Sequence, residues 1–263
     1  MLIDTHAHIH FDEFKDVLGL MFKTAKSNKV ESIISVGTNE ADSINVLNFV
    51  SDPSVLSISQ DIHLYATAGI HPHDASRGKP AFNNLKNTIN TDKLKNKVLA
   101  IGECGLDYYR NLSSKSEQFE MLELQLGLAN EQNLPVVFHV RDAWEDFFAI
   151  LNNHPKTRGV IHSFTGHSQQ VELANKHGLY FGINGIMTFT KDPKQIEALK
   201  QIPSERLLLE TDCPYLAPAP YRGKINQPGY IVHIAEFIAN TIRRDFKDIA
   251  NTTTSNAKEL FEI

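Results

Sequence analysis

The sequence of 263 residues contains only two cysteines, Cys104 and Cys213. Two thiols are too few for a disulfide framework, so we expect both to be free in a reducing compartment. No apolar run reaches the ~18 residues of a membrane span, and the N-terminus lacks the basic and apolar segments of a secretory signal. These absences predict a cytoplasmic protein with no membrane partner, and no feature of the sequence indicates an obligate protein partner.

An excess of positive charge is also absent. The 26 Lys and Arg residues are outnumbered by 31 Asp and Glu residues, which gives a formal net charge of -5. Without a broad basic field, the protein can hold a polyanion only through a local site. Hydrophobic residues make up 41% of the chain, which is enough to build a sizeable core.

Linkers, low-complexity segments and breaks in composition are absent as well, so we expect a single domain over residues 1–263. Short apolar runs alternate with amphipathic stretches along the chain. The runs, which we interpret as buried strands, span residues 2–4, 31–36, 64–70, 98–102, 135–140, 159–162, 179–183 and 206–211. The helical stretches span residues 12–28, 114–132, 143–153, 192–201, 230–244 and 255–261.

About eight strand–helix units in a chain of this length predict an α/β fold, a (β/α)8 TIM barrel, whose usual size is ~250 residues. A doubly wound open sheet is the main alternative, because the pattern of one sequence does not reveal whether a sheet closes. Its dinucleotide-binding form is disfavoured, since no G-x-G-x-x-G turn follows the first run.

Residues that commonly bind metal ions follow most of the predicted strands. In a parallel barrel the carboxyl ends of the strands surround the active site, so these residues would meet at one mouth. They are His6 and His8 after the first run, His71 and His73 after the third, Glu103 after the fourth, His139 in the fifth, His162 in the sixth and Asp212 after the eighth.

His6 and His8 have a definite relation to each other. Positions i and i+2 of a strand point to the same face, so one strand can supply two imidazole ligands to one cation, with Ala7 facing the helices. His10 shares the parity but lies where the chain already enters a loop, and we expect it to be a loop residue near the mouth.

Each of these residues also has an ordinary structural interpretation. A single histidine at a strand end is more often hydrogen-bonded than metal-bound, Glu103 could form a salt bridge, and Asp212 could cap a helix. Six candidates at five strand ends make a set of independent structural roles improbable. Carboxylates and imidazoles crowded in one mouth would be costly to bury without a cation.

Four histidines, one glutamate and one aspartate exceed what one tetrahedral ion needs. We therefore predict two divalent cations, one held by His6, His8, Glu103 and Asp212 and the other by Glu103, His139 and His162. Two such ions ~3.5–4 Å apart can activate water and stabilise both the entering and the leaving oxygen of a phosphodiester. Asp212 is the preferred general base, because it can accept a proton from the attacking water.

Seven ordered blocks carry a resemblance to a known family. They are DTHAHIHF, GIHPHDA, AIGECGLDYYR, VVFHVRDA, IHSFTGH, LLLETDCPYLAP and YRGKINQPGYIVHIA. The chain resembles, from end to end, the TatD family of metal-dependent deoxyribonucleases in the amidohydrolase superfamily. The resemblance implies a barrel of the metal-dependent hydrolase type and a 3′→5′ exonuclease acting on single-stranded DNA or RNA.

Carried over to this sequence, the family's metal ligands fall on His6, His8, Glu103, His139, His162 and Asp212, with Glu103 as the bridging carboxylate. Three further residues are predicted substrate contacts. His71 could donate to a phosphate oxygen, Arg141 lies two residues beyond His139 with the same parity, and Arg222 lies in a loop that mixes basic and aromatic residues, which suits a flexible single strand.

Two other functions remain open at this point. The same metal scaffold could hydrolyse an amide or ester, for example as an aminoacyl-tRNA deacylase, because water attack on a carbonyl uses the same Lewis-acid chemistry. Alternatively, the ions could be structural and the barrel a binding module. Metal identity is open as well: the imidazoles favour Zn²⁺ or Mn²⁺, whereas the family resembles Mg²⁺-supported nucleases.

Overall fold

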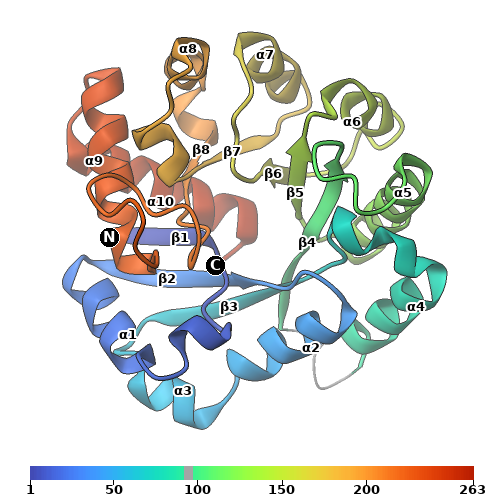
Figure 1. Cartoon of the computed structure of the whole chain (residues 1–263), viewed down its shortest axis with the longest axis horizontal. Coiled ribbons are helices and arrows are strands. Elements are labelled where there is room, and N and C mark those ends of the chain that lie inside the picture. Colours follow the sequence, from blue (N-terminus) through green and yellow to red (C-terminus); the bar gives the residue numbers. More distant parts are fainter. Residues whose placement is uncertain (92–96) are drawn as a thin grey trace.

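A computed structural model describes residues 1–91 and 97–263, and its centre is a sheet of eight parallel strands in the order β1 to β8. The strands surround the middle of the molecule, and most of the helices lie outside them (Figure 1). The strands are β1 (Leu2–Ala7), β2 (Val30–Val36), β3 (His63–Ala68), β4 (Val98–Asp107), β5 (Val136–Arg141), β6 (Gly159–Ile161), β7 (Tyr180–Ile183) and β8 (Leu207–Leu209). The predicted (β/α)8 barrel is confirmed, and the alternative of an open doubly wound sheet is wrong.

The helices lie between successive strands, as the crossovers of a parallel sheet require, except for the last two, which follow β8. They are α1 (Leu18–Ser27), α2 (Glu40–Phe49), α3 (Pro53–Ile58), α4 (Gly78–Ile89), α5 (Lys115–Gln132), α6 (Trp144–Leu151), α7 (Ser168–Lys176), α8 (Pro193–Gln201), α9 (Ile231–Ile242) and α10 (Phe246–Phe261). None of the helices described is both long and apolar enough to cross a membrane.

Helix α5 shows how local sequence sets these boundaries. Ser114 caps its first turn and forms a capping box with Glu117, which satisfies backbone N–H groups that have no partner inside the helix. The predicted apolar face is confirmed, because Leu122, Leu126 and Ala129 are all buried.

The predicted boundaries are wrong in two helices. The stretch 12–28 is a short 3-10 turn at Asp12–Phe14 followed by α1 from Leu18, and the last helix begins at Phe246 rather than at residue 255.

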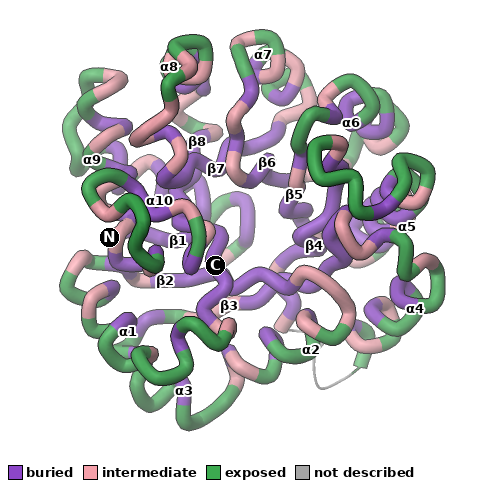
Figure 2. Tube along the Cα trace, in the orientation of Figure 1, coloured by how far each residue is buried: buried purple, intermediate pink, exposed green. Residues whose placement is uncertain are grey.

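Two apolar layers hold the barrel, and buried residues follow the ring of strands in Figure 2. The larger layer packs the strands against the outer helices. The smaller one fills the barrel interior and continues onto α10, so this helix covers one end of the barrel. Its members are Ile3, Ile34, Ala100, Val137, Val160, Tyr180, Leu208, Ala257, Leu260 and Phe261.

The barrel closes between its first and last strands through the segment that follows β8. Ala7 forms a parallel bridge with Cys213, and the His8 N–H donates to the Cys213 carbonyl over 2.8 Å. The Asp212 N–H donates to the His6 carbonyl, also over 2.8 Å. This closure joins the predicted ligands of β1 directly to Asp212.

Candidate metal centre

The carboxyl ends of the strands open into a pocket of about 900 Å³. Among its lining residues are His8, His71, Glu103, His139, Arg141, His162 and Asp212. His6 lies beneath this pocket, fully buried, with its Nε2 atom 3.4 Å from Glu103. The six predicted metal ligands are therefore brought together, although they come from five segments of the chain.

Strand β4 places Glu103 at the centre of this cluster. The sequence predicted that the strand ends just before Glu103, and this is wrong: β4 continues to Asp107, with an irregular register against β5 between residues 101 and 104. Gly102 and Gly105 have positive φ, and a Cβ at Gly105 would overlap the His139 carbonyl oxygen. Glycine thus lets β4 approach β5 closely enough for Glu103 to meet His139.

Both oxygens of Glu103 face imidazole nitrogens. Oε1 lies 2.8 Å from His139 Nδ1 and 3.4 Å from both His71 Nε2 and His162 Nε2, while Oε2 faces His6. Burial opposes ionisation of Glu103, but the nearby histidines outweigh it and hold the pKa of the carboxyl well below its usual range. Glu103 is thus an anion that two cations could share.

Three groups of residues have ligand atoms close enough to hold an ion. They are His6, His8 and Glu103; His6, His162 and Asp212; and His71, Glu103 and His139. Two of the groups share Glu103, as a bridging ligand would. The grouping differs from the predicted one in two ways: His71, and not His162, is placed with Glu103 and His139, and Asp212 is placed with His6 and His162 rather than with His8 and Glu103.

The hydrogen bonds of the histidines indicate which nitrogens are available to a metal ion. His8 donates from Nδ1 to the Val36 carbonyl over 2.9 Å, and His162 Nδ1 lies 3.1 Å from Glu210. In both rings Nε2 is therefore the nitrogen that faces the cluster. Within the described part of the chain, neither nitrogen of the buried His6 has a hydrogen-bond partner, which is costly unless a ligand satisfies it.

His71 has the opposite arrangement. Its Nδ1 accepts the backbone N–H of His73 over 3.1 Å, so the neutral ring carries its proton on Nε2 and points it at Glu103. Burial lowers the pKa of His71 to about 4, so the ring is neutral at pH 7. Such a ring is a hydrogen-bond donor toward Glu103 rather than a good metal ligand, and its predicted contact with a substrate phosphate stays a prediction.

The rings of His6 and His162 stack with their centroids 3.7 Å apart. Burial and the charge on His162 lower the pKa of His6. Burial opposes protonation of His162, but the carboxylates of Glu210 and Glu103 raise its pKa to about 10. Without a metal ion, one of two stacked rings would hold a proton, which an ion at the same place would displace.

Arg141 and Arg222, the predicted basic contacts, lie in different surroundings. Arg141 is exposed, lines the pocket, and stacks its guanidinium 3.9 Å from the centre of the Tyr109 ring. Arg222 is not among the residues that line this pocket; its guanidinium lies 3.5 Å from the centre of the Phe189 ring. The structure thus brings Arg141, and not Arg222, to the mouth.

His10, which the sequence predicted to be a loop residue, is half-buried, and both of its ring nitrogens have a hydrogen-bond partner. Its Nδ1 lies 2.9 Å from Ser35 Oγ and its Nε2 lies 3.0 Å from Asp42. With both nitrogens engaged outside the cluster, His10 has a structural role distinct from that of His6 and His8.

Two buried carboxylates that touch the predicted ligands were not found from the sequence. Glu210 accepts the Ser163 N–H over 2.7 Å as well as contacting His162, and Asp107 contacts His139. Both had a usable signal, because Glu210 lies two residues before Asp212 and Asp107 lies four residues after Glu103.

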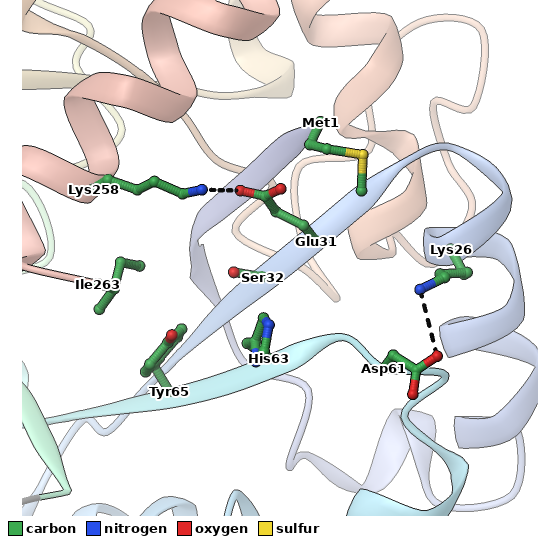
Figure 3. A pocket seen from close by; sticks show the side chains of 9 residues that line it. All are labelled: Met1, Lys26, Glu31, Ser32, Asp61, His63, Tyr65, Lys258 and Ile263. Atoms are coloured by element: carbon green, nitrogen blue, oxygen red, sulfur yellow. Dashed lines mark ion pairs between the residues drawn. The ribbon is translucent and has the colours of Figure 1, made fainter.

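A second pocket lies at the opposite end, beside the N-terminal ends of β2 and β3 (Figure 3). Its charged side chains pair with one another: Lys258 Nζ is 2.8 Å from Glu31, and Lys26 Nζ is 3.8 Å from Asp61. Within residues 1–91 and 97–263, every candidate metal group lies at the mouth instead.

Comparisons with known proteins identify the family of this chain. A family model described as TatD related DNase matches residues 3–262. The uncharacterized metal-dependent hydrolase YabD of Bacillus subtilis is 38% identical over the whole of both chains, and the 3′-5′ ssDNA/RNA exonuclease TatD of Pantoea ananatis is 34% identical, again over 100% of both. The crystal structure of YJJV, a TatD homolog from Escherichia coli, has a TM-score of 0.88 at 27% identity and covers 100% of this chain and 98% of that chain. The chain belongs to the TatD-related DNase family.

Proposed function

We propose that this protein is a metal-dependent 3′→5′ exonuclease that acts on single-stranded DNA or RNA. The observation that carries the proposal is the place of Glu103 at the floor of an open pocket, where one of its oxygens faces His6 and the other faces His139 and His162. The names of the relatives support it, since one is called a metal-dependent hydrolase and another a 3′-5′ ssDNA/RNA exonuclease.

His6, His8, Glu103 and Asp212 would hold one divalent ion, and Glu103, His139 and His162 the other. The unpartnered nitrogens of buried His6 fit this ligand set, as do the Nε2 atoms of His8 and His162, which face the cluster because their Nδ1 atoms are bonded elsewhere. When bound, Mg²⁺, Mn²⁺ or Zn²⁺ supplies Lewis-acid polarisation of the phosphate and lowers the pKa of water. The imidazole content favours Zn²⁺ or Mn²⁺ as the resident ions.

The protein's own groups would orient the substrate and move protons. Burial opposes ionisation of Asp212, but its hydrogen bond to His8 and the nearby histidines hold its pKa below the usual range, so it is ionised and can take a proton from the attacking water. His71 would donate from Nε2 to a phosphate oxygen. Arg141 would bind the neighbouring phosphate, while the exposed ring of Tyr109 beneath it offers a face on which a base can stack.

The test uses chelator-treated protein reloaded with Mg²⁺, Mn²⁺ or Zn²⁺ and single-stranded oligonucleotides labelled at either end. We expect shortening from the 3′ end, and loss of this activity in Glu103→Ala and Asp212→Ala. An aminoacyl-RNA is assayed in parallel. Deacylation by metal-loaded protein that leaves the oligonucleotides intact would contradict the proposal and favour the amide or ester hydrolase instead.

A further inference from the structure

Asp107, the last residue of β4, is a fully buried carboxylate that contacts two histidines through one oxygen. Its Oδ2 atom lies 3.1 Å from His139 Nε2 and 3.0 Å from His73 Nε2. His139 is a candidate metal ligand and His73 is not, so the contact joins the ligand cluster to a residue outside it.

The carboxylate of Asp107 is held in one orientation from the other side. Its Oδ1 accepts the backbone N–H groups of Tyr109 over 3.0 Å and Arg110 over 2.8 Å. The buried side-chain amide of Gln118 bonds both the N–H and the carbonyl of Asp107, over 2.7 and 3.1 Å. These bonds leave Oδ2 free to act as a fixed acceptor for the histidines.

His139 faces a carboxylate at each ring nitrogen, Glu103 at Nδ1 and Asp107 at Nε2. With Nε2–H donating to Asp107, the neutral ring has its lone pair on Nδ1, which lies 2.8 Å from Glu103 Oε1. His8 and His162 have the reverse arrangement, because their Nδ1 atoms are bound to Val36 and Glu210. His139 thus faces the cluster through the other nitrogen.

We propose that Asp107 is a positioning residue: it fixes His139 in the tautomer whose Nδ1 binds the metal ion shared with Glu103. This inference rests on the proposed metal centre. A carboxylate behind a metal-bound histidine orients the ring and raises its basicity. The hydrogen bonds of Asp107 include none to His6, His8 or Asp212. We therefore expect Asp107 to affect the binding of only one of the two ions, the one that His139 would hold.

The isosteric variant Asp107→Asn separates positioning from folding. The two backbone N–H groups of residues 109 and 110 hold the amide oxygen in the place of Oδ1, so the amide nitrogen replaces Oδ2 and donates to His139 Nε2. The ring proton then moves to Nδ1 and blocks metal binding there. His73→Ala and Glu123→Gln are matched controls, because the first keeps the bond from Asp107 to His139 and the second removes a carboxylate from His154 at a distance from the mouth.

Calorimetric titration of chelator-treated proteins with Mn²⁺ and Zn²⁺ measures the two ions without any substrate. We expect Asp107→Asn to weaken one class of sites about 10–100-fold and to leave the other class, and both controls, at wild-type affinity. The inference would be overturned if Asp107→Asn bound ions at both classes of sites with wild-type affinity. It would also be overturned if the folded variant lost affinity equally at both classes. Wild-type protein that binds no ion would instead refute the proposed function.

Nitrogen-15 spectra of the histidine rings in the Zn²⁺-loaded wild type give a second measurement that needs no variant. We expect His139 to bind Zn²⁺ through Nδ1 and to carry its proton on Nε2. Coordination through Nε2 would overturn the inference even if Asp107→Asn failed to fold.

Discussion

Glu103→Gln should remove most of the stabilisation that divalent ions give to this protein. The substitution keeps the shape of the side chain but replaces a shared anion with a neutral group. In the native cluster Oε1 faces three imidazole nitrogens at 2.8–3.4 Å and Oε2 faces His6 at 3.4 Å. Oε2 faces His6 of one proposed ligand set and Oε1 faces His139 and His162 of the other, so one substitution affects both proposed ions.

The size of the effect follows from mass action. An ion present at 100 times its dissociation constant stabilises the folded state by about 2.7 kcal/mol, so two ions contribute about 5 kcal/mol. For a chain of this size, each kcal/mol raises the melting temperature by about 2–4 °C. We therefore expect saturating Mn²⁺ or Zn²⁺ to raise the melting temperature of the wild type by about 10–20 °C, and that of Glu103→Gln by less than about 5 °C.

The assay is calorimetric or fluorescence melting of each protein with chelator and with excess metal ion, so that every variant is compared with itself. Glu123→Gln, which removes a carboxylate on α5, should show the full wild-type shift. A shift of wild-type size in Glu103→Gln would refute the role of Glu103 as the shared ligand. A wild-type shift near half the expected value would indicate one ion rather than two.

Three further outcomes are expected. In chelator-treated protein the pKa of His162 is about 10, above its unfolded value near 6.5. The protonated ring therefore contributes its full stabilisation below pH ~6.5, and this contribution is lost as the pH rises toward 10. Melting temperatures measured from pH 7 to 10 should fall more steeply for the wild type than for His162→Asn, and equal slopes would contradict this. Arg141→Ala should raise KM for oligonucleotides about 10-fold with little change in kcat, since a charge-assisted hydrogen bond contributes about 1.5–3 kcal/mol, and Arg141→Lys should recover part of the loss in steady-state assays. Phe261 of α10 is 2% exposed and belongs to the smaller apolar layer. Phe261→Ala should lower the free energy of unfolding by about 3–5 kcal/mol in urea titrations, while the activity per folded molecule stays unchanged. A loss below about 1 kcal/mol would show that α10 does not seal the barrel.

The strands were predictable because parallel strands buried on both faces are continuous apolar runs. The exception was β4, where the sequence suggested an end at Gly102. Gly102 and Gly105 mark a close approach to β5, not a turn, and only the neighbouring strand reveals this.

The last helix was predicted too short for a related reason. The segment that precedes residue 255 is rich in Thr and Asn, which have low helix propensity. In the folded protein Ile249 and Thr253 are buried, and the Asn256 amide donates to the carbonyls of Ser204 and Leu207 over 2.8 Å. Tertiary contacts therefore extend α10 beyond what its sequence suggests.

Candidate ligands were predictable because their residue types are unusual at strand ends, whereas the pairing of each ligand with the residue that orients it was not. Glu210 and Asp107 lie inside runs whose other members are ordinary strand residues, and their role appears only when His162 and His139 come within reach. Which nitrogen each ring offers depends on a hydrogen bond from a different strand. No spacing in the sequence encodes that choice.

The backbone pairing that closes the barrel between β1 and the segment after β8 has a consequence for biosynthesis. Asp212 and Cys213, whose backbones pair with His6 and His8, leave the ribosome some 200 residues after them. Until then the first two histidines lack the partner that fixes their strand and the carboxylate beside them. The nascent chain therefore acquires a complete set of ligands only at the moment of ring closure, so a truncated or stalled product would be released without competence to cut nucleic acid.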